Sequence, residues 1–235
     1  MSSEYIRARQ ELIQPDRFLN ADLSILEKFS NKTISLKKVL AQLKSKVPEH
    51  LLTTSGVDAI TIGTFPFLSK ISATSVFQDG GIYISSKVPS EQDLREALIH
   101  EYAHAIEKTN EDVLYGGGSV EQEFLGKRER LKERIAAAGF FVKRYNFSAT
   151  VEDNKLFDLF FSKIGYDKMV SMTKDLFISA YSATSLSEYF STCFTTYFFV
   201  HGKYKTLSEL SPAVFNKLQI LSLRPTDTLA EGEEE

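Results

Sequence analysis

Apolar residues recur at helical spacing in residues 1–50, between polar stretches rich in Lys, Gln and Glu. This spacing predicts two amphipathic helices, separated near Ser30-Asn31. The apolar positions are Leu23, Leu26 and Phe29 in the first helix and Leu36, Val39, Leu40, Leu43 and Val47 in the second. We therefore expect residues 1–50 to form an N-terminal helical segment that packs on the domain that follows.

Residues 57–63 alternate between apolar and other side chains, as in a half-buried β-strand. Two further short runs, residues 74–78 and 81–85, flank the step Asp79-Gly80. An Asp-Gly step between two such runs is a strong signal for a tight hairpin turn. The three runs together predict a small mixed sheet.

A long amphipathic helix is predicted directly after this sheet. Ser90 is placed to be its N-cap, and Asp93 follows three residues later, which is typical of a capping box. The apolar positions that then recur at helical spacing are Leu94, Ala97, Leu98, Tyr102, Ala105 and Ile106. The run Gly116-Gly117-Gly118 predicts an end to the helical region.

The second half of the chain is predicted to be mainly helical. Residues 119–137 carry charges of both signs three and four apart, which favours a solvated helix with ion pairs over a nucleic-acid site. Residues 140–178 are rich in Phe and Tyr and predict a satellite core, and residues 229–235 predict an acidic disordered tail. We expect an α+β fold in which residues 51–228 form one domain, with a small mixed sheet in a predominantly helical chain.

Composition excludes several classes of protein. The 235 residues are 43% hydrophobic and 25% charged, which is ordinary for a globular protein, and a net charge of −3 gives no reason to expect nucleic acid or an anionic membrane as partner. The single cysteine, Cys193, excludes an intramolecular disulfide and a cysteine-rich zinc site. We find no signal peptide and no window of about 18 apolar residues. A cytoplasmic protein is expected, or one exported without a cleaved leader.

The most specific feature is the run His100-Glu101-Tyr102-Ala103-His104 inside the predicted long helix. Positions i and i+4 of a helix lie one turn apart on one face, so both imidazoles point to the same place. Two imidazoles can hold Zn²⁺, and a Glu between them can act as general base toward a metal-activated water. The competing interpretation is a surface helix that happens to carry two His.

The order of strand, hairpin and helix is the one that a zinc peptidase domain needs. An exposed edge of the sheet beside the metal lets the substrate main chain pair with it as an added strand. The outer arm of the hairpin is the expected edge, with Val76, Phe77 and Gln78 as the substrate-binding residues. Alternatively, another part of the chain covers this edge.

A catalytic zinc site takes three protein ligands. One class of sites places a third His six residues after the second, with a Gly between them, but Glu107 and Asn110 occupy those positions here. His201 follows an aromatic run, which favours a structural role. The third ligand is therefore expected to be a carboxylate from a later helix.

Two carboxylate sources remain open at this point. Glu121 and Glu123 follow the Gly run, but their charge-dense helix favours a solvated role. Glu188 lies in an apolar helix, where a metal ion would compensate an otherwise costly charge. However, Ser185-x-x-Glu188 is also a capping box that needs no metal.

Tyr181 precedes Glu188 by seven residues. With this pair and the His-Glu-x-x-His run, the chain resembles the catalytic domain of anthrax toxin lethal factor and the secreted Pro-Pro endopeptidases related to it. The resemblance covers His100 to Ala105 and Tyr181 to Phe194, and more loosely the hairpin. The stretch between His104 and Tyr181 is longer than this resemblance leads us to expect.

The resemblance implies a zincin-like fold, with the small mixed sheet and an active-site helix, and a zinc-dependent endopeptidase that acts on a protein or peptide. His100, His104 and Glu188 would hold Zn²⁺, and Glu101 would take a proton from the attacking water and pass it to the leaving amine. Tyr181 would donate its phenol O–H to the developing oxyanion, a role worth about 2–4 kcal/mol. The alternatives are an ordinary half-buried Tyr181, a non-catalytic interaction protein that keeps a zincin fold, and a toxin-like effector protease delivered into another cell.

Overall fold

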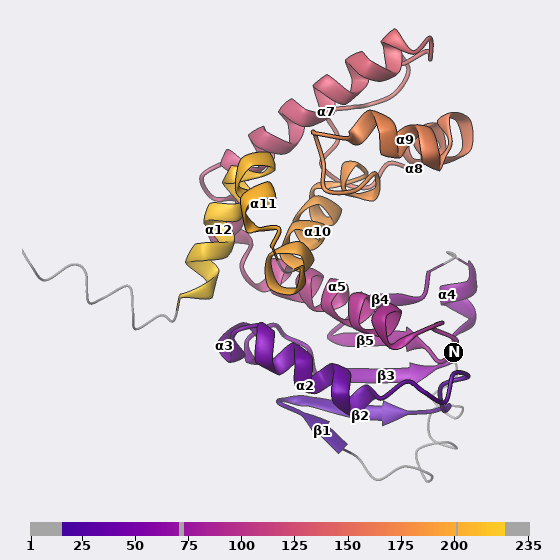
Figure 1. The fold of residues 1–235 in the computed structure, drawn as a ribbon, viewed down its shortest axis with the longest axis vertical. Coiled ribbons are helices and arrows are strands. Elements are labelled where there is room, and N and C mark those ends of the chain that lie inside the picture. Colours follow the sequence, from indigo (N-terminus) through magenta and orange to yellow (C-terminus); the bar gives the residue numbers. More distant parts are fainter. Residues whose placement is uncertain (1–15, 71–72, 201, 224–235) are drawn as a thin grey trace, which may run out of the picture. The chain divides into compact units, whose positions relative to one another are not determined.

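A computed structural model describes residues 16–70, 73–200 and 202–223. The chain divides into two compact units, Met1–Thr109 and Asn110–Glu235. The first unit holds a five-stranded mixed sheet with helices, and the second is built from helices (Figure 1). The α+β class that the sequence predicts is therefore confirmed. In the part of the chain that the structure describes, no helix is both long and apolar enough for a membrane crossing.

The sheet of the first unit has the strand order β1-β2-β3-β5-β4. Its strands are β1 (Asp16–Phe18), β2 (Ala21–Ile25), β3 (Ala59–Gly63), β4 (Ser75–Gln78) and β5 (Gly81–Ser85). The pairs β2–β3 and β3–β5 are parallel, whereas β1–β2 and β4–β5 are antiparallel. The three predicted strands are confirmed, and so is the hairpin turn, since Asp79 (φ 50°) and Gly80 (φ 78°) both have the positive φ of a type I′ turn.

The central strands form the core of this unit because their alternate side chains are buried. Ile60 and Ile62 of β3 and Ile82 and Ile84 of β5 are all fully buried. The helices of the unit are α2 (Leu36–Lys46), α3 (Glu49–Thr53), α4 (Pro66–Lys70) and α5 (Glu91–Thr109). Helix α5 packs on β4 and β5, with α2 beside it (Figure 1).

Two of the predicted helices are confirmed, α2 and α5, and so is the predicted N-cap Ser90. The N-cap Ser35 accepts a hydrogen bond from the Lys38 N–H at 3.3 Å at the start of α2. Ser90 accepts one from the Asp93 N–H at 3.2 Å at the start of α5, and its hydroxyl donates to the Asp93 carboxylate. These caps satisfy main-chain donors that a helix N-terminus leaves without partners.

The helix predicted around Leu23 is wrong, because residues 21–25 form strand β2. The run Ala21-Asp22-Leu23-Ser24-Ile25 alternates with period two, and so short an apolar pattern fits a strand as well as a helix. Leu23 pairs with Ile60 in the parallel ladder between β2 and β3. The predicted boundary at residue 50 therefore cuts through one sheet, and the predicted domain of residues 51–228 is divided after Thr109. The predicted tail, residues 229–235, lies outside the described residues.

The second unit consists of short and medium-length helices. They are α6 (Glu111–Tyr115), α7 (Ser119–Ala137), α8 (Asn154–Phe157), the π-helical η1 (Asp158–Ile164), α9 (Tyr166–Thr173), the 3₁₀ turn η2 (Tyr181–Ala183), α10 (Leu186–Phe199), α11 (Tyr204–Leu210) and α12 (Pro212–Ser222). Helix α7 spans the residues that the charge pattern predicts, and the left-handed Gly118 (φ 67°) is its N-cap.

Helix α7 is only partly the solvated helix that its composition predicts: one face is exposed and carries the Lys132–Glu129 ion pair at 2.8 Å, but the other face is buried. Lys127 and Arg128 are fully buried, with 2% and 0% of their surface exposed. The guanidinium of Arg128 lies 5.1 Å from the centre of the Phe124 ring, and its Nη1 donates to the Thr184 carbonyl at 3.3 Å. This contact fixes the segment that leads into α10. The charge pattern fails for this face because α7 packs against α9, α10 and α12 within the second unit.

A buried polar network surrounds Lys127. Its ammonium donates to Tyr189 Oη and, at 2.9 Å, to Ser211 Oγ. Tyr189 Oη in turn donates to Glu123 Oε1 at 2.7 Å, and Glu123 Oε2 accepts the Ala213 N–H at 2.9 Å. Burial nevertheless dominates, and it lowers the pKa of Lys127 to about 8.

The lowered pKa of Lys127 predicts a measurable pH dependence of stability. In the unfolded chain Lys127 has a pKa of about 10.4, so above pH 8 the unfolded chain binds more protons at this site than the folded protein. The stability contributed by this residue therefore rises with pH, by about 1 kcal/mol between pH 7 and pH 9. We expect the difference in unfolding free energy between wild type and Lys127→Met to shift by this amount in urea titrations.

The buried Cys193 thiol, whose pKa burial raises to about 12, is present in both proteins, so its titration cancels in this difference. Parallel stability curves of wild type and Lys127→Met between pH 7 and pH 9 would contradict the burial of a charged Lys127.

Candidate metal centre

His100 and His104 lie one turn apart on α5, and their side chains face each other. The two Nε2 atoms are 3.1 Å apart, and the ring centroids are 4.6 Å apart with perpendicular planes. Two nitrogens that bind one tetrahedral Zn²⁺ at 2.0–2.1 Å lie about 3.3 Å from each other. The imidazole pair therefore fits a shared metal ion.

The apolar face of α5 holds these imidazoles in place. Leu98, Tyr102 and Ile106 are buried on it, and the Tyr102 ring contacts Phe18 of β1 edge to face at 6.4 Å. Burial also raises the pKa of the Tyr102 phenol. Because this face packs on the sheet, the opposite side of the helix presents the two His, both half-buried.

Glu101 is joined to the outer strand of the sheet. The residue is buried, with 5% of its surface exposed. Oε1 accepts the Ser75 hydroxyl at 2.7 Å, and Oε2 accepts the Phe77 main-chain N–H at 2.6 Å. A carboxylate has about four lone-pair positions, so two remain for other donors. The candidate general base is thus oriented by β4, while it lies on the same helix as both His.

The hydrogen-bond pattern of the hairpin decides which residues of β4 can pair with a substrate. The Ser85 N–H donates to the Thr74 carbonyl at 2.8 Å, so Thr74 is in a hydrogen-bonded pair. Such pairs alternate along an antiparallel ladder, which turns the main-chain groups of Val76 and Gln78 toward β5. The main-chain groups of Ser75 and Phe77 point away from β5 instead.

The substrate-binding role of Val76, Phe77 and Gln78 stays a prediction, but their main-chain groups are not equally placed for strand pairing. β4 is the last strand of the sheet in the described part of the first unit, as expected. Of Val76, Phe77 and Gln78, however, only Phe77 turns main-chain groups to the outer side, and Glu101 accepts its N–H. The Phe77 carbonyl and the main chain of Ser75 are the groups left for strand pairing.

Glu107 is a residue of the site that the sequence analysis does not identify. Its Oε2 lies 3.6 Å from His104 Nδ1, and the residue is largely buried. A carboxylate beside the second ring nitrogen of a ligating His fixes the orientation of the ring and raises its basicity. The signal in the sequence is the i, i+3 spacing, which puts both side chains on one face of α5.

This contact predicts that Glu107→Gln weakens zinc binding about tenfold, since removal of such a partner lowers metal affinity about 10- to 100-fold. The measurement is a competition titration of Zn²⁺ against a chelator. Glu96→Gln, an exposed position on the same helix, is the matched control and should keep wild-type affinity. Equal affinities for the two variants would show that Glu107 does not act on His104.

Glu188 lies in the first turn of α10 and is buried, with 6% of its surface exposed. The N-cap Ser185 accepts the Glu188 N–H at 3.1 Å, so this half of the predicted capping box is present. Glu188 Oε2 lies 3.5 Å from Ser191 Oγ, which is long for a hydrogen bond. The capping contact uses the main-chain N–H of Glu188, so it leaves the side-chain carboxylate available for another role.

Tyr181 begins the turn η2, which leads into α10. The residue is 40% exposed, and its ring contacts the rings of Phe157 and Phe161 at centroid distances of 6.4 Å. It is therefore a half-exposed aromatic residue supported on one side by apolar rings. Tyr181 and Glu188 belong to the second unit, and His100, Glu101 and His104 to the first.

Of the other candidate ligands, Glu121 is exposed and Glu123 is held by Tyr189 Oη and the Ala213 N–H. His201 lies outside the described residues. These contacts favour a structural role for Glu123. The choice of third ligand therefore rests on Glu188.

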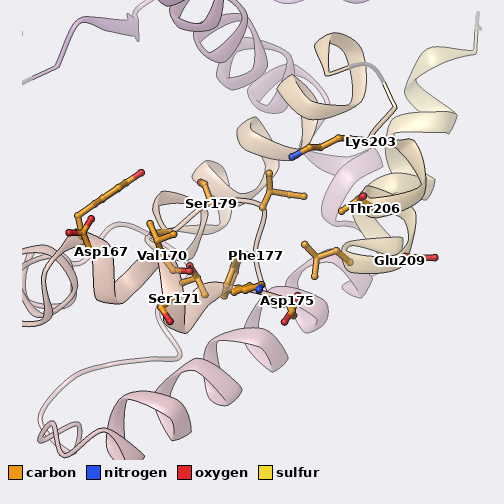
Figure 2. Close-up of a pocket in the computed structure, with 15 residues that line it drawn as sticks. Asp167, Val170, Ser171, Asp175, Phe177, Ser179, Lys203, Thr206 and Glu209 are labelled. Carbon is orange, nitrogen blue, oxygen red and sulfur yellow. The ribbon is translucent and has the colours of Figure 1, made fainter.

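The second unit also contains a cavity of about 810 Å³ (Figure 2). Residues of α9, of the segment that follows it and of α11 line the cavity, among them Val170, Phe177 and Thr206. Asp167, Asp175, Lys203 and Glu209 give its wall charges of both signs. None of the residues predicted for the metal site lines this cavity.

No family model matches the chain, and searches of curated proteins and of solved structures give no match either.

Proposed function

We propose that this protein is a zinc-dependent endopeptidase in which His100, His104 and Glu188 hold the metal. The single observation that carries the proposal is the pair of Nε2 atoms 3.1 Å apart, with a buried Glu next to the first His on the same helix. Each of the three residues offers one ligand atom of a type that zinc takes. The same donor set, two neutral imidazoles and one carboxylate, suits catalytic rather than structural zinc.

When bound, Zn²⁺ acts as a Lewis acid toward a peptide carbonyl and lowers the pKa of water. Glu101 accepts the proton of the attacking water and delivers it to the amine that leaves. Tyr181 donates its phenol O–H to the carbonyl oxygen as negative charge develops there. The outer side of β4 aligns the substrate by strand pairing through the Phe77 carbonyl.

One observation favours a second candidate, a non-catalytic interaction protein with a metal-bearing scaffold. Both carboxylate oxygens of Glu101 accept hydrogen bonds from β4, so Glu101 also ties α5 to the sheet. If Glu101 has this structural role alone, the protein binds zinc but does not hydrolyse peptides.

The experiment that separates the two candidates combines metal analysis with a cleavage assay. The purified full chain is loaded with Zn²⁺, its metal content is measured, and it is incubated with a peptide library derived from a proteome. One zinc per chain together with chelator-sensitive cleavage supports the endopeptidase. Stoichiometric zinc without cleavage of any peptide supports the interaction protein, and a chain that binds no zinc contradicts both.

A further inference from the structure

Among the described residues of the first unit, Ser75 is the one whose side chain donates a hydrogen bond to the Glu101 carboxylate. The Ser75 Oγ to Glu101 Oε1 distance of 2.7 Å is typical of a charge-assisted hydrogen bond. The second contact, from the Phe77 N–H to Oε2 at 2.6 Å, comes from the main chain two residues further along β4. Two donors on one strand thus define the plane of the carboxylate.

Such an arrangement has a catalytic consequence for a general base. Proton transfer requires the accepting oxygen to be aimed at the reacting water, and a misplacement of about 1 Å can cost about 100-fold in rate. A Glu side chain has three rotatable bonds, so its carboxylate needs partners that fix it. Both donors lie on β4, the strand with which the substrate is proposed to pair. The same strand therefore aligns the substrate and the Glu101 carboxylate.

We propose that Ser75 is a positioning residue that, with the Phe77 N–H, holds the Glu101 carboxylate in the orientation needed for proton transfer. This inference rests on the proposed endopeptidase function. It also assigns Ser75, rather than Val76 or Gln78, as the side chain of β4 on which turnover depends.

The first test measures the contact itself, independently of zinc and of activity. In amide hydrogen exchange followed by NMR, the Phe77 N–H, which points away from β5, should be protected in wild type because Glu101 accepts it. Glu101→Ala should reduce this protection about tenfold or more, as expected for a hydrogen bond to a charged group. The Val76 N–H faces β5 and should keep its protection, which shows that the strand stays paired. Equal exchange of Phe77 in both proteins overturns the proposal.

The second test measures kinetics with the zinc-loaded chain. Ser75→Ala should lower kcat about 10- to 100-fold, with KM and zinc content unchanged, while Ser75→Thr, which keeps the hydroxyl, should restore most of the activity. Thr74→Ala removes an exposed hydroxyl from the neighbouring residue and should behave as wild type. Equal kcat values for Ser75→Ala and Thr74→Ala overturn the proposal. If wild type binds zinc but hydrolyses no peptide, the endopeptidase function fails, even where the exchange data still show the contact.

Discussion

Glu101→Gln is expected to lower kcat for peptide hydrolysis by about 10²- to 10⁴-fold, the range that general acid–base catalysis supplies. The amide has nearly the shape of the carboxylate, but it cannot take a proton from water at neutral pH. One amide oxygen can still accept the Ser75 hydroxyl or the Phe77 N–H, so the contact between α5 and β4 is weakened rather than removed. The measurement is single-turnover and steady-state cleavage of a peptide from the library screen.

The zinc content of Glu101→Gln must match wild type, since Glu101 is not among the proposed ligands. Glu96→Gln makes the same chemical change at an exposed position of α5 and should retain full activity. A Glu101→Gln protein that binds zinc and cleaves at the wild-type rate would remove Glu101 from the mechanism. Loss of zinc in this variant would instead point to a rearranged helix.

The parts of the fold that follow from the sequence are those in which local signals agree. The Asp79-Gly80 turn, the alternation on both sides of it and the capping box at Ser90 predict β4, β5 and α5 correctly. β2 is missed because so short a run of apolar positions fits the period of a helix as well as that of a strand. In addition, its partner β3 is far away in the chain. Strand pairing of this kind is a tertiary effect that a local pattern does not contain.

The same reasoning explains what the sequence reveals of the candidate site. The spacing of His100 and His104 determines their geometry, since one helix carries both. Glu107 contacts His104 through that helix as well, and could have been found by testing the i+3 position. The donors to Glu101 come from another element, so no spacing rule predicts Ser75. The burial of Lys127 is likewise invisible, because other helices of the second unit cover a helix whose own pattern is polar.

Glu188→Gln is expected to weaken zinc binding about 100-fold, because a neutral amide replaces the one anionic ligand, and in structural zinc sites with four protein ligands each ligand contributes about 3 kcal/mol on average. The amide removes the anionic ligand, but Gln serves a capping box as well as Glu does. The main-chain contact from the Glu188 N–H to Ser185 Oγ is also retained. We therefore expect the zinc affinity to fall while the unfolding free energy of the zinc-free protein stays within about 0.5 kcal/mol of wild type.

Ser185→Ala is the converse change, and it separates the two roles that the sequence leaves open for Glu188. It removes the N-cap oxygen, which costs about 1 kcal/mol of stability, but leaves the carboxylate in place. If Glu188 is a zinc ligand, the zinc affinity falls in Glu188→Gln, whereas the unfolding free energy falls in Ser185→Ala. If the carboxylate serves only the helix cap, Glu188→Gln binds zinc like wild type, and the third ligand must be sought elsewhere. Glu123→Gln is a third variant to compare. We expect lower stability, because an NH₂ group replaces one of the two oxygens that accept the Tyr189 hydroxyl and the Ala213 N–H, and unchanged zinc affinity.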